Sequence, residues 1–541
     1  KRSSYYLSVG NTDQQAILPD FYYNRSNVQA NIEANLATGL SVGTQISAIL
    51  EKTHNVGVPG LDDYFNPLLS VFSMWPIESP YANDNPNYIH QTHNVNVNPA
   101  TYKDDVTGWI DIYQRTTNVN LYAKYDFKFG LSLKGTYSYN YRNDDFDGFE
   151  YTYDAYKYDP ETDTYYTQPG WGNQNPWREK HKRNVVQRFQ QIQANYNKTF
   201  NDHSLSAVLA YERSDYDNTY FVVHTVPSNN YIEKMYLYEQ DYLGDDWSYQ
   251  ARAGFIGRVN YNYKERYMLE LLGRYDGSYL YYKDSRFGFF PGFSAAWRIS
   301  DEPFFEPLKS SVNDLKIRGS YVVTGSEMGV NAFDYLGGFN YGWGSSVFDG
   351  KFVNGLQPRG LPIRNLSWVK NNSTNIGVDF SLMQYKLTGS IDLFERRRTG
   401  LPAARYDVKL PSEIGYSLPN ENLESDAHRG VEGLISYQDE VGEFKYKVAA
   451  NASLARRRWL SSYKPRFGNS WNEYRNSIED RWTGITWGYQ IIGRFESMED
   501  IATYPINNDG RGNTDMLPGD FKYKDVNNDG IINYMDERPI G

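Results

Sequence analysis

Apolar and polar residues alternate along most of this chain. Between Tyr249 and Tyr263, one set of alternate positions holds aromatic, aliphatic and glycine residues, whereas the other set is mostly polar or charged. The same two-residue period recurs at 119–139, 315–321 and 444–454. Because successive side chains of a β-strand point to opposite faces, this pattern predicts strands with one apolar face and one polar face.

The predicted strands are long. Several exceed the roughly 5 to 6 residues usual in soluble sheets and match the roughly 9 to 11 residues with which a tilted strand crosses a bilayer. In a transmembrane antiparallel β-barrel, the apolar face meets lipid and the polar face lines a wet interior. A large soluble β-sandwich or propeller would show the same alternation. The fifteen predicted ranges are 5–11, 22–35, 40–54, 109–127, 131–143, 184–197, 203–215, 247–263, 267–280, 287–299, 314–325, 372–383, 386–398, 428–439 and 444–459.

The links between these strands alternate between short and long wherever the difference is clear. The tight links are 37–39, 129–130, 198–202, 264–266, 384–385 and 441–443. The long links are around 55–108, 144–183, 216–246, 326–371 and 399–427. Outer-membrane barrels have short turns on one side and long extracellular loops on the other, so this parity favours a barrel over a sandwich.

Residues 1–459 are therefore interpreted as the transmembrane strands and loops of an all-β barrel, and residues 460–541 as a long extracellular loop region with little strand pattern. Bacterial single-chain barrels have an even number of strands. Fifteen strands thus indicate that this sequence is a portion of a longer chain. The missing strands are expected at least after Gly541.

The composition narrows the possible functions. The net charge of −11 disfavours binding to nucleic-acid phosphates. The chain has no cysteine, which excludes disulfides, thiolate zinc sites and cysteine nucleophiles. No apolar run approaches the roughly 18 residues of a membrane-spanning helix. His90 and His93 are interpreted as exposed loop residues, and no nucleophile elbow, phosphate-binding glycine loop or paired-carboxylate motif supports an enzyme.

Six groups of residues, in a consistent order along the chain, resemble one known family. They are Tyr6–Gly10 with Asp13–Gln14, Asn24–Asn27, Arg286–Pro291 with Ala295–Ser300, Leu315–Tyr321 with Thr324–Gly325, Thr374–Asp379, and Pro518–Gly541. Together they resemble the SusC-like (RagA-like) TonB-dependent transporters of the Bacteroidetes outer membrane.

The resemblance implies a barrel of about 22 strands in the outer membrane of a Gram-negative bacterium. It also implies an N-terminal plug, a TonB-binding segment and a SusD-like surface lipoprotein as partner. The plug, the TonB-binding segment and the final strands are missing from this sequence. The implied function is TonB-dependent import of oligomeric nutrients, with glycans as the first expectation for the ligand. The alternatives are a siderophore or peptide TonB-dependent receptor, or a surface β-rich carbohydrate-binding adhesin that does not transport.

One segment, residues 525–536, has the spacing of a cation-binding loop. Oxygen-bearing side chains occupy loop positions 1, 3, 5, 9 and 12, with glycine at position 6. Asp525, Asn527 and Asp529 would supply side-chain oxygens, Ile531 a backbone carbonyl, and Asp536 would close the shell. We therefore expect a structural Ca²⁺ (or Mg²⁺) that rigidifies an extracellular loop. The alternative is a loop rich in Asx turns without an ion.

Two further groups of residues are candidates for contacts outside the barrel. The runs Arg396–Arg397–Arg398 and Arg456–Arg457–Arg458 lie at the outward ends of predicted strands, where they would meet lipopolysaccharide phosphates or simply be solvated. Loop aromatics can stack on sugar rings or on a partner protein, although many tyrosines must belong to the membrane interface. The candidates for ligand or partner contact are Trp75, Trp171, Trp177, Tyr341, Trp343 and Trp471.

Overall fold

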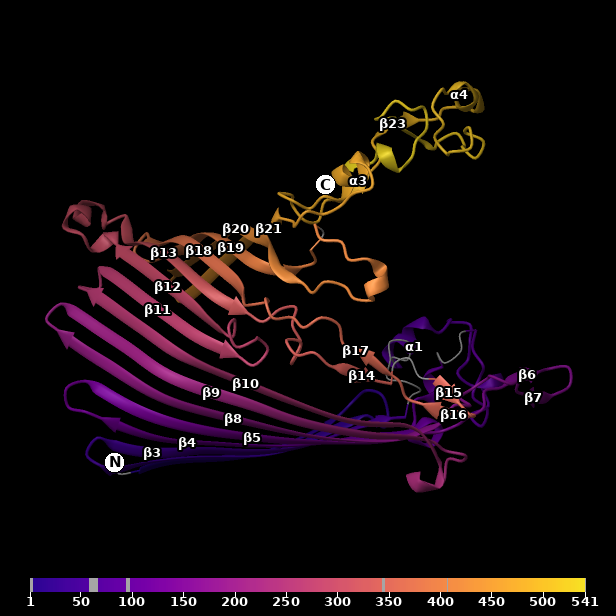
Figure 1. The fold of residues 1–541 in the computed structure, drawn as a ribbon, viewed down its shortest axis with the longest axis horizontal. Helices are drawn as coiled ribbons and strands as arrows, with labels where there is room; N and C mark the ends of the chain where they lie inside the picture. The colour runs from indigo at the N-terminus through magenta and orange to yellow at the C-terminus, as the bar shows by residue number, and fades with distance from the viewer. Residues whose placement is uncertain (1–2, 58–66, 94–97, 343–345, 406, 541) are drawn as a thin grey trace. The chain divides into compact units, whose positions relative to one another are not determined.

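The computed structural model describes residues 3–57, 67–93, 98–342, 346–405 and 407–540, and most of these residues lie in strands (Figure 1). Fifteen strands form one sheet in the order β1-β2-β3-β4-β5-β8-β9-β10-β11-β12-β13-β18-β19-β20-β21. The predicted all-β antiparallel architecture and the strand count are confirmed. In the part of the chain that the structure describes, no helix is long and apolar enough to span a membrane.

Contacts divide the chain into two compact units, 1–198 with 206–257 and 199–205 with 258–541. Most of unit one consists of long strands, and its loops hold short helices and one small hairpin. The strands are β1 (Ser3–Gln15), β2 (Tyr22–Ala37), β3 (Leu40–Val56), β4 (Gly108–Asp126), β5 (Leu131–Glu150), β8 (Trp177–Phe200), β9 (His203–Val226) and β10 (Glu239–Tyr263), the last three reaching into unit two. The loops hold α1 (Pro67–Ser73), η1 (Ala82–Asp84), η2 (Pro99–Thr101), α2 (Asp104–Thr107), β6 (Lys157–Asp159), β7 (Thr164–Tyr166) and η3 (Met235–Leu237).

Unit two contains the remaining long strands and a C-terminal region of short elements. The long strands are β11 (Tyr267–Ser278), β12 (Phe287–Arg298), β13 (Val312–Ser326), β18 (Val369–Leu382), β19 (Leu387–Ala403), β20 (Glu421–Val441) and β21 (Phe444–Ser461). The links hold η4 (Ile299–Asp301), η5 (Pro303–Leu308), η6 (Ser412–Ile414) and the hairpins β14 (Phe339–Tyr341) with β17 (Leu356–Pro358) and β15 (Ser346–Phe348) with β16 (Lys351–Val353). The C-terminal region holds α3 (Ser470–Asn476), β22 (Trp487–Gly488), β23 (Ile491–Arg494), α4 (Met498–Thr503), β24 (Phe521–Tyr523), η7 (Tyr534–Asp536) and β25 (Arg538–Pro539).

Glycine closes the tight turns where the backbone requires it. Gly130, between β4 and β5, has a φ of +99°, and a Cβ there would lie 2.4 Å from the Asn197 carbonyl oxygen. Gly39, between β2 and β3, has a φ of +82° and a comparable approach to the Asp126 carbonyl. In unit one, these turns lie at one end of the strands, and α1, β6 and β7 lie at the other (Figure 1).

Large apolar side chains cover one face of the strands and remain exposed. In unit two, Ile376 of β18 pairs with Leu393 of β19, which pairs with Val431 of β20, and their exposed fractions are 57%, 58% and 38%. In unit one, Leu121 of β4 pairs with Tyr137 of β5, and both are exposed. Rows of exposed apolar residues on one face are expected where strands meet lipid.

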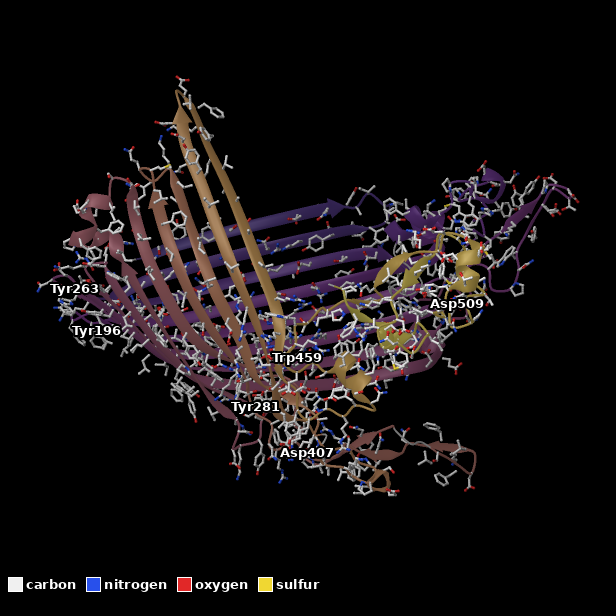
Figure 2. The ribbon with its side chains drawn as sticks, turned by 90° about the horizontal axis from the view of Figure 1, so that it is seen from above. Tyr196, Tyr263, Tyr281, Asp407, Trp459 and Asp509 are labelled. Atoms are coloured by element: carbon white, nitrogen blue, oxygen red, sulfur yellow. The ribbon has the colours of Figure 1, made fainter. Side chains whose placement is uncertain are left out.

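Tyrosines mark the turn ends of this apolar face. Tyr196 and Tyr263, labelled in Figure 2, lie near the turn ends of β8 and β10, and Tyr446 lies near the start of β21. Tyrosine combines an apolar ring with a polar hydroxyl, which suits the boundary between lipid and water. These positions agree with the expectation that many tyrosines belong to the membrane interface, here on the side of the tight turns.

Candidate functional site

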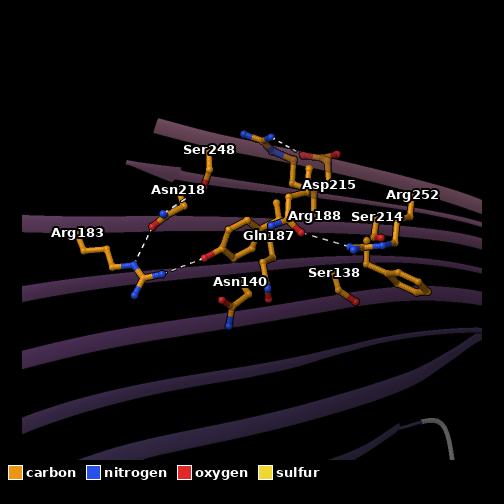
Figure 3. A pocket seen from close by; sticks show the side chains of 13 residues that line it. Ser138, Asn140, Arg183, Gln187, Arg188, Ser214, Asp215, Asn218, Ser248 and Arg252 are labelled. Carbon is orange, nitrogen blue, oxygen red and sulfur yellow. Dashed lines mark hydrogen bonds and ion pairs between the residues drawn. The ribbon is translucent and has the colours of Figure 1, made fainter. Parts of the chain in front are cut away.

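An open groove lies along β5, β8, β9 and β10 in unit one, with a volume of about 580 Å³ (Figure 3). Polar-face side chains of all four strands line it. They include Asn140, Arg183, Asn218, Ser248, Gln250 and Arg252. The groove therefore occupies the face that a membrane barrel turns toward its wet interior.

Hydrogen bonds between neighbouring strands orient the polar side chains that line the groove. Arg183 Nε donates to Asn218 Oδ1 at 2.8 Å, and Arg183 Nη2 donates to the Tyr216 hydroxyl at 3.3 Å. Asn218 Nδ2 in turn donates to Ser248 Oγ at 3.3 Å. Among the described residues, no carboxylate forms an ion pair with Arg183, so its charge is held in place by neutral groups. Guanidinium, amide and hydroxyl groups of this kind bind sugar hydroxyls or peptide amides.

Alternation assigns two other groove residues to the opposite face. Arg188 of β8 pairs with Tyr139 of β5, on the apolar face. Its guanidinium forms an ion pair with Asp215 at 2.8 Å. This pair does not contribute to the polar wall.

Tyrosine rings from two distant loops stack in unit one. Tyr88 and Tyr165 lie parallel with ring centroids 3.8 Å apart, and Tyr158 lies 5.1 Å from Tyr165. The side-chain amides of Asn83 and Asn85 donate to the Tyr165 hydroxyl at 3.5 and 3.3 Å. We call Tyr88, Tyr158 and Tyr165 the loop tyrosine stack. The sequence alone does not single out Tyr158 and Tyr165, because nothing local shows that the β6–β7 hairpin meets the segment 83–88.

Trp171 lies beside the hairpin that carries this stack. Its ring centroid is 5.9 Å from that of Tyr166, and Lys157 Nζ lies 5.4 Å from its ring centroid. Tyr166 is 41% exposed. An aromatic surface flanked by an ammonium group therefore faces the solvent at this hairpin.

The other predicted loop aromatics have separate surroundings. Trp75 stacks on His93 at 4.0 Å, and Trp177 packs against Phe146 at 6.3 Å. Gly148 makes room for Trp177, since a Cβ there would lie 2.7 Å from the indole ring. In unit two, Tyr341 is 82% exposed on β14. Trp471 lies under Arg538 at 5.0 Å, and Trp343 falls outside the described residues.

The loop 525–536 folds its polar side chains onto its own backbone. Asp525 accepts hydrogen bonds from the Gly530 and Asp529 amides at 2.8 and 3.3 Å. The amide of Ile531 and the side chain of Asn527 hydrogen-bond to Asp529 and hold the pKa of its carboxyl below the usual value.

Asp536 is fully buried and accepts from the amides of Val526 and Asn533 at 2.8 and 2.9 Å, at the start of η7. In the described part of the chain, no three His, Asp or Glu side chains gather as a metal cluster. The cation site at Asp525, Asn527, Asp529, Ile531 and Asp536 stays a prediction.

Strand pairing divides the two arginine runs between the faces of the sheet. Arg398 lies opposite Asp426 on β20, and Arg457 lies on the same polar face. Arg398 Nε and Arg457 Nε donate to the buried Asp426 carboxylate at 2.8 and 2.6 Å. Arg396 shares the parity of Arg398 and lies on this face too. The predicted lipopolysaccharide contact is therefore open only to Arg397, Arg456 and Arg458, which lie on the apolar face.

The comparisons with known proteins agree with this architecture. Residues 53–530 match the family model described as TonB dependent receptor-like, beta-barrel. The chain therefore belongs to this family of β-barrel proteins, which lie in the outer membrane of Gram-negative bacteria. The predicted fold class, family resemblance and location are confirmed.

Two relatives and one solved structure define the similarity further. TonB-dependent receptor P39 of Formosa agariphila is 26% identical over 379 residues, which are 64% of this chain and 36% of that protein. TonB-dependent receptor SusC of Bacteroides thetaiotaomicron is 29% identical over 216 residues, which are 39% of this chain and 21% of SusC. The RagAB peptide importer in its open-open state matches with a TM-score of 0.75 at 16% identity, covering 100% of this chain and 56% of that chain. The matched residues thus span from about a fifth to just over half of the length of these proteins.

Proposed function

We propose that the complete protein imports oligosaccharides across the outer membrane, driven by TonB and assisted by a SusD-like surface lipoprotein. Family membership and the similarity to SusC support the transporter class. The SusD-like lipoprotein is the partner that the family resemblance implies. TonB would act through the segment that the family resemblance assigns to the N-terminal side of this chain.

The main observation in favour of an oligosaccharide ligand is the aromatic surface on the loops of unit one. The loop tyrosine stack and Trp171 present flat apolar rings beside amide and ammonium groups. Sugar rings have apolar faces and hydroxyl edges, so they pack on aromatic rings while their hydroxyls bond to neighbouring polar groups. A peptide would need fewer such platforms and would rely more on charged or main-chain partners.

The polar groove would receive the ligand after the loops. Arg183, Asn218 and Ser248 form a connected row of donors and acceptors along the polar face. Such a row offers many weak, exchangeable hydrogen bonds, and weak bonds let a polar oligomer bind and leave. The mechanism therefore has two steps for this chain: capture on aromatic loops, followed by passage along a hydrogen-bonding wall.

A binding experiment on the complete transporter tests this proposal. Trp171→Ala should raise the dissociation constant for a cognate oligosaccharide by roughly 5- to 30-fold, because a central aromatic contact contributes about 1 to 2 kcal/mol. Phe129→Ala is the matched control, since Phe129 is also exposed but lies in a tight turn. Calorimetry with a panel of oligosaccharides and peptides provides the measurement. Binding of peptides alone by the native protein would refute the glycan assignment.

We also propose that the loop 525–536 binds one structural Ca²⁺. The fold of the loop brings Asp525, Asn527 and Asp529 together through its amide hydrogen bonds. An ion would offset the repulsion between the Asp525 and Asp529 carboxylates and fix the loop. Its effect would be on the docking of the lipoprotein partner, because the parity of the links assigns this region to the extracellular side and the family resemblance assigns it to the neighbourhood of the SusD-like lipoprotein.

A further inference from the structure

Four arginines and a tryptophan gather on the apolar face of β19, β20 and β21. They are Arg397, Arg429, Arg456, Arg458 and Trp482, which we call the outer basic patch. Arg397, Arg429 and Arg456 are exposed. The patch begins where the apolar rows of these three strands end.

The strand register fixes the order of these rows. Leu393, Val431 and Leu454 form the last apolar row. The next row on the same face holds Glu395, Arg429 and Arg456. The row after it holds Arg397, Ala427 and Arg458. Apolar side chains thus give way to guanidinium groups within one step of the pleat.

The distance from the turn end places this change at a membrane boundary. From Tyr446, near the turn end of β21, to Arg456 the strand runs through eleven residues. A tilted strand crosses the hydrocarbon layer in roughly 9 to 11 residues. The outer basic patch therefore lies at the interface opposite the tight turns, which is the outer leaflet in this family of barrels.

Backbone pairing holds Trp482 in the patch. Trp482 forms an antiparallel bridge with Arg458, and the amides of Trp459 and Thr483 donate to the carbonyls of Arg481 and Arg457 at 2.8 and 2.9 Å. The guanidinium carbons of Arg456 and Arg458 lie 5.4 and 5.5 Å from the centroid of the Trp482 ring. At a membrane boundary, the ring of such a tryptophan can contact apolar groups and the two guanidinium cations, while its N–H faces the polar side of the boundary.

The patch has more positive charge than its own carboxylates neutralise. Arg429 pairs with Glu395 at 2.5 Å, and Arg458 pairs with Asp480 at 2.7 Å. Arg397 and Arg456 form no ion pair with any residue that the structure describes. Ala427 is fully buried between Arg397 and Arg458. Arg397 and Arg458 are therefore two strands apart, or roughly 10 Å, and only the small side chain of Ala427 lies between them.

We propose that the outer basic patch binds the phosphate groups of lipopolysaccharide in the outer leaflet. Guanidinium groups bind phosphate through paired hydrogen bonds that are short and strong. The acyl chains of the same lipid would lie along the row of Leu393, Val431 and Leu454. Only three arginines of the two runs take part, because Arg396, Arg398 and Arg457 face the polar side, and Arg429 joins them from β20.

The test compares the binding of two lipids to the complete transporter in detergent. It measures lipid binding alone, so its outcome does not depend on which nutrient is imported. Native mass spectrometry would count the lipids bound to each barrel, with phosphorylated lipid A and the same lipid stripped of its phosphates as probes. The native protein should bind the phosphorylated form at least tenfold more tightly. Equal binding of the two lipids would overturn the proposal, and so would equal binding of phosphatidylglycerol and phosphorylated lipid A.

A matched pair of variants assigns the effect to the patch. R397Q with R456Q removes the two charges that have no described carboxylate partner, and should reduce the preference for the phosphorylated lipid at least fivefold. K445Q with K447Q removes two charges near the turn end of β21 and should leave the preference unchanged. If the first double variant lacks the heat-modifiable mobility of a folded barrel, R397Q alone should reduce the preference in the same direction. A folded R397Q/R456Q barrel with the native preference would overturn the proposal.

Discussion

At the scale of single residues, alternation along a strand decides which side chains meet lipid. Phe255 is 50% exposed on the apolar face of β10, whereas Arg258 lies on the polar face and donates to Glu270 through Nε at 2.9 Å. Both assignments follow from the sequence, because the two-residue period is local. The hydrogen-bond partners of these polar side chains are harder to predict from the sequence. Nothing near Arg398 or Arg457 in the sequence indicates that both donate to Asp426.

Arginine in place of Phe255 should therefore destabilise the folded barrel by about 2 to 4 kcal/mol, since a charge near the bilayer midplane loses its hydration. Arg258→Gln should cost less than about 1 kcal/mol, because the ion pair is partly exposed on the wet face. Denaturant titration in lipid vesicles measures both values. Similar costs for the two substitutions would contradict the assignment of faces.

Asp407 provides a second test at this scale, through pH. Its carboxylate, labelled in Figure 2, accepts from Arg405 at 3.1 and 3.2 Å and from the Tyr463 hydroxyl at 3.0 Å. Arg405, followed by Tyr463 and Lys464, holds the pKa of Asp407 well below its usual range. A lowered pKa means that the stabilisation is present above the unfolded pKa and is lost as the pH falls through the folded pKa.

The loop between β19 and β20 should therefore resist proteolysis above about pH 4 and become cleavable as the pH falls further. Asp407→Asn should be cleaved readily even at pH 7, because the amide cannot replace the charge. Digestion with a neutral protease at pH 7 and with an acid-active protease below about pH 4, each followed by mass spectrometry, measures cleavage of both proteins. Equal resistance of the variant and the native protein at pH 7 would contradict a role for Asp407.

At the scale of elements, the sequence predicts the strands better at their turn ends than at their loop ends. The turn between β8 and β9 lies within the predicted link 198–202. However, β5 and β8 continue to the pair Glu150 and Trp177, well beyond the predicted limits of 143 and 184. The apolar pattern stops where lipid stops, while the hydrogen-bond ladder needs only a neighbouring strand. A polar strand extension therefore resembles a loop in the sequence.

Contacts between loop side chains are the hardest feature of the structure to predict from the sequence. Trp171 was identified as a candidate from its residue type, but its neighbours Lys157 and Tyr166 depend on how the β6–β7 hairpin folds. The stack of Tyr88 on Tyr165 joins two loops that are far apart along the chain. Such contacts form through tertiary structure, and no periodicity of the sequence encodes them.

The loop 525–536 carries a prediction at this scale. Replacing Asp525 and Asp529 with Ala should abolish binding of one Ca²⁺ per chain and weaken docking of the lipoprotein partner, without unfolding the barrel. Asp515→Ala, which removes an exposed carboxylate paired with Arg511, should bind Ca²⁺ normally. Calorimetric titration of the complete protein measures the stoichiometry. Crystals grown with calcium should show oxygen ligands at about 2.3 to 2.6 Å. A well-ordered loop without an ion in such crystals would contradict the proposal.

At the scale of the whole molecule, long strands, parity of links and family membership agree on an outer-membrane barrel. The sequence predicts this class because the bilayer sets strand length and face polarity everywhere along the chain. The ligand is not encoded in the same way. It depends on a few loop side chains such as Trp171 and on the remainder of the relatives' length, of which this chain covers about a third to a half.

Uptake of labelled oligosaccharides by intact cells tests the central claim most directly. A strain that lacks this transporter should lose energy-dependent uptake of one class of oligosaccharide and retain peptide uptake. The native gene should restore uptake, and a version with Trp171→Ala should restore it only at higher ligand concentration. Unchanged oligosaccharide uptake in the deletion strain across the panel, or loss of peptide uptake in its place, would contradict the account.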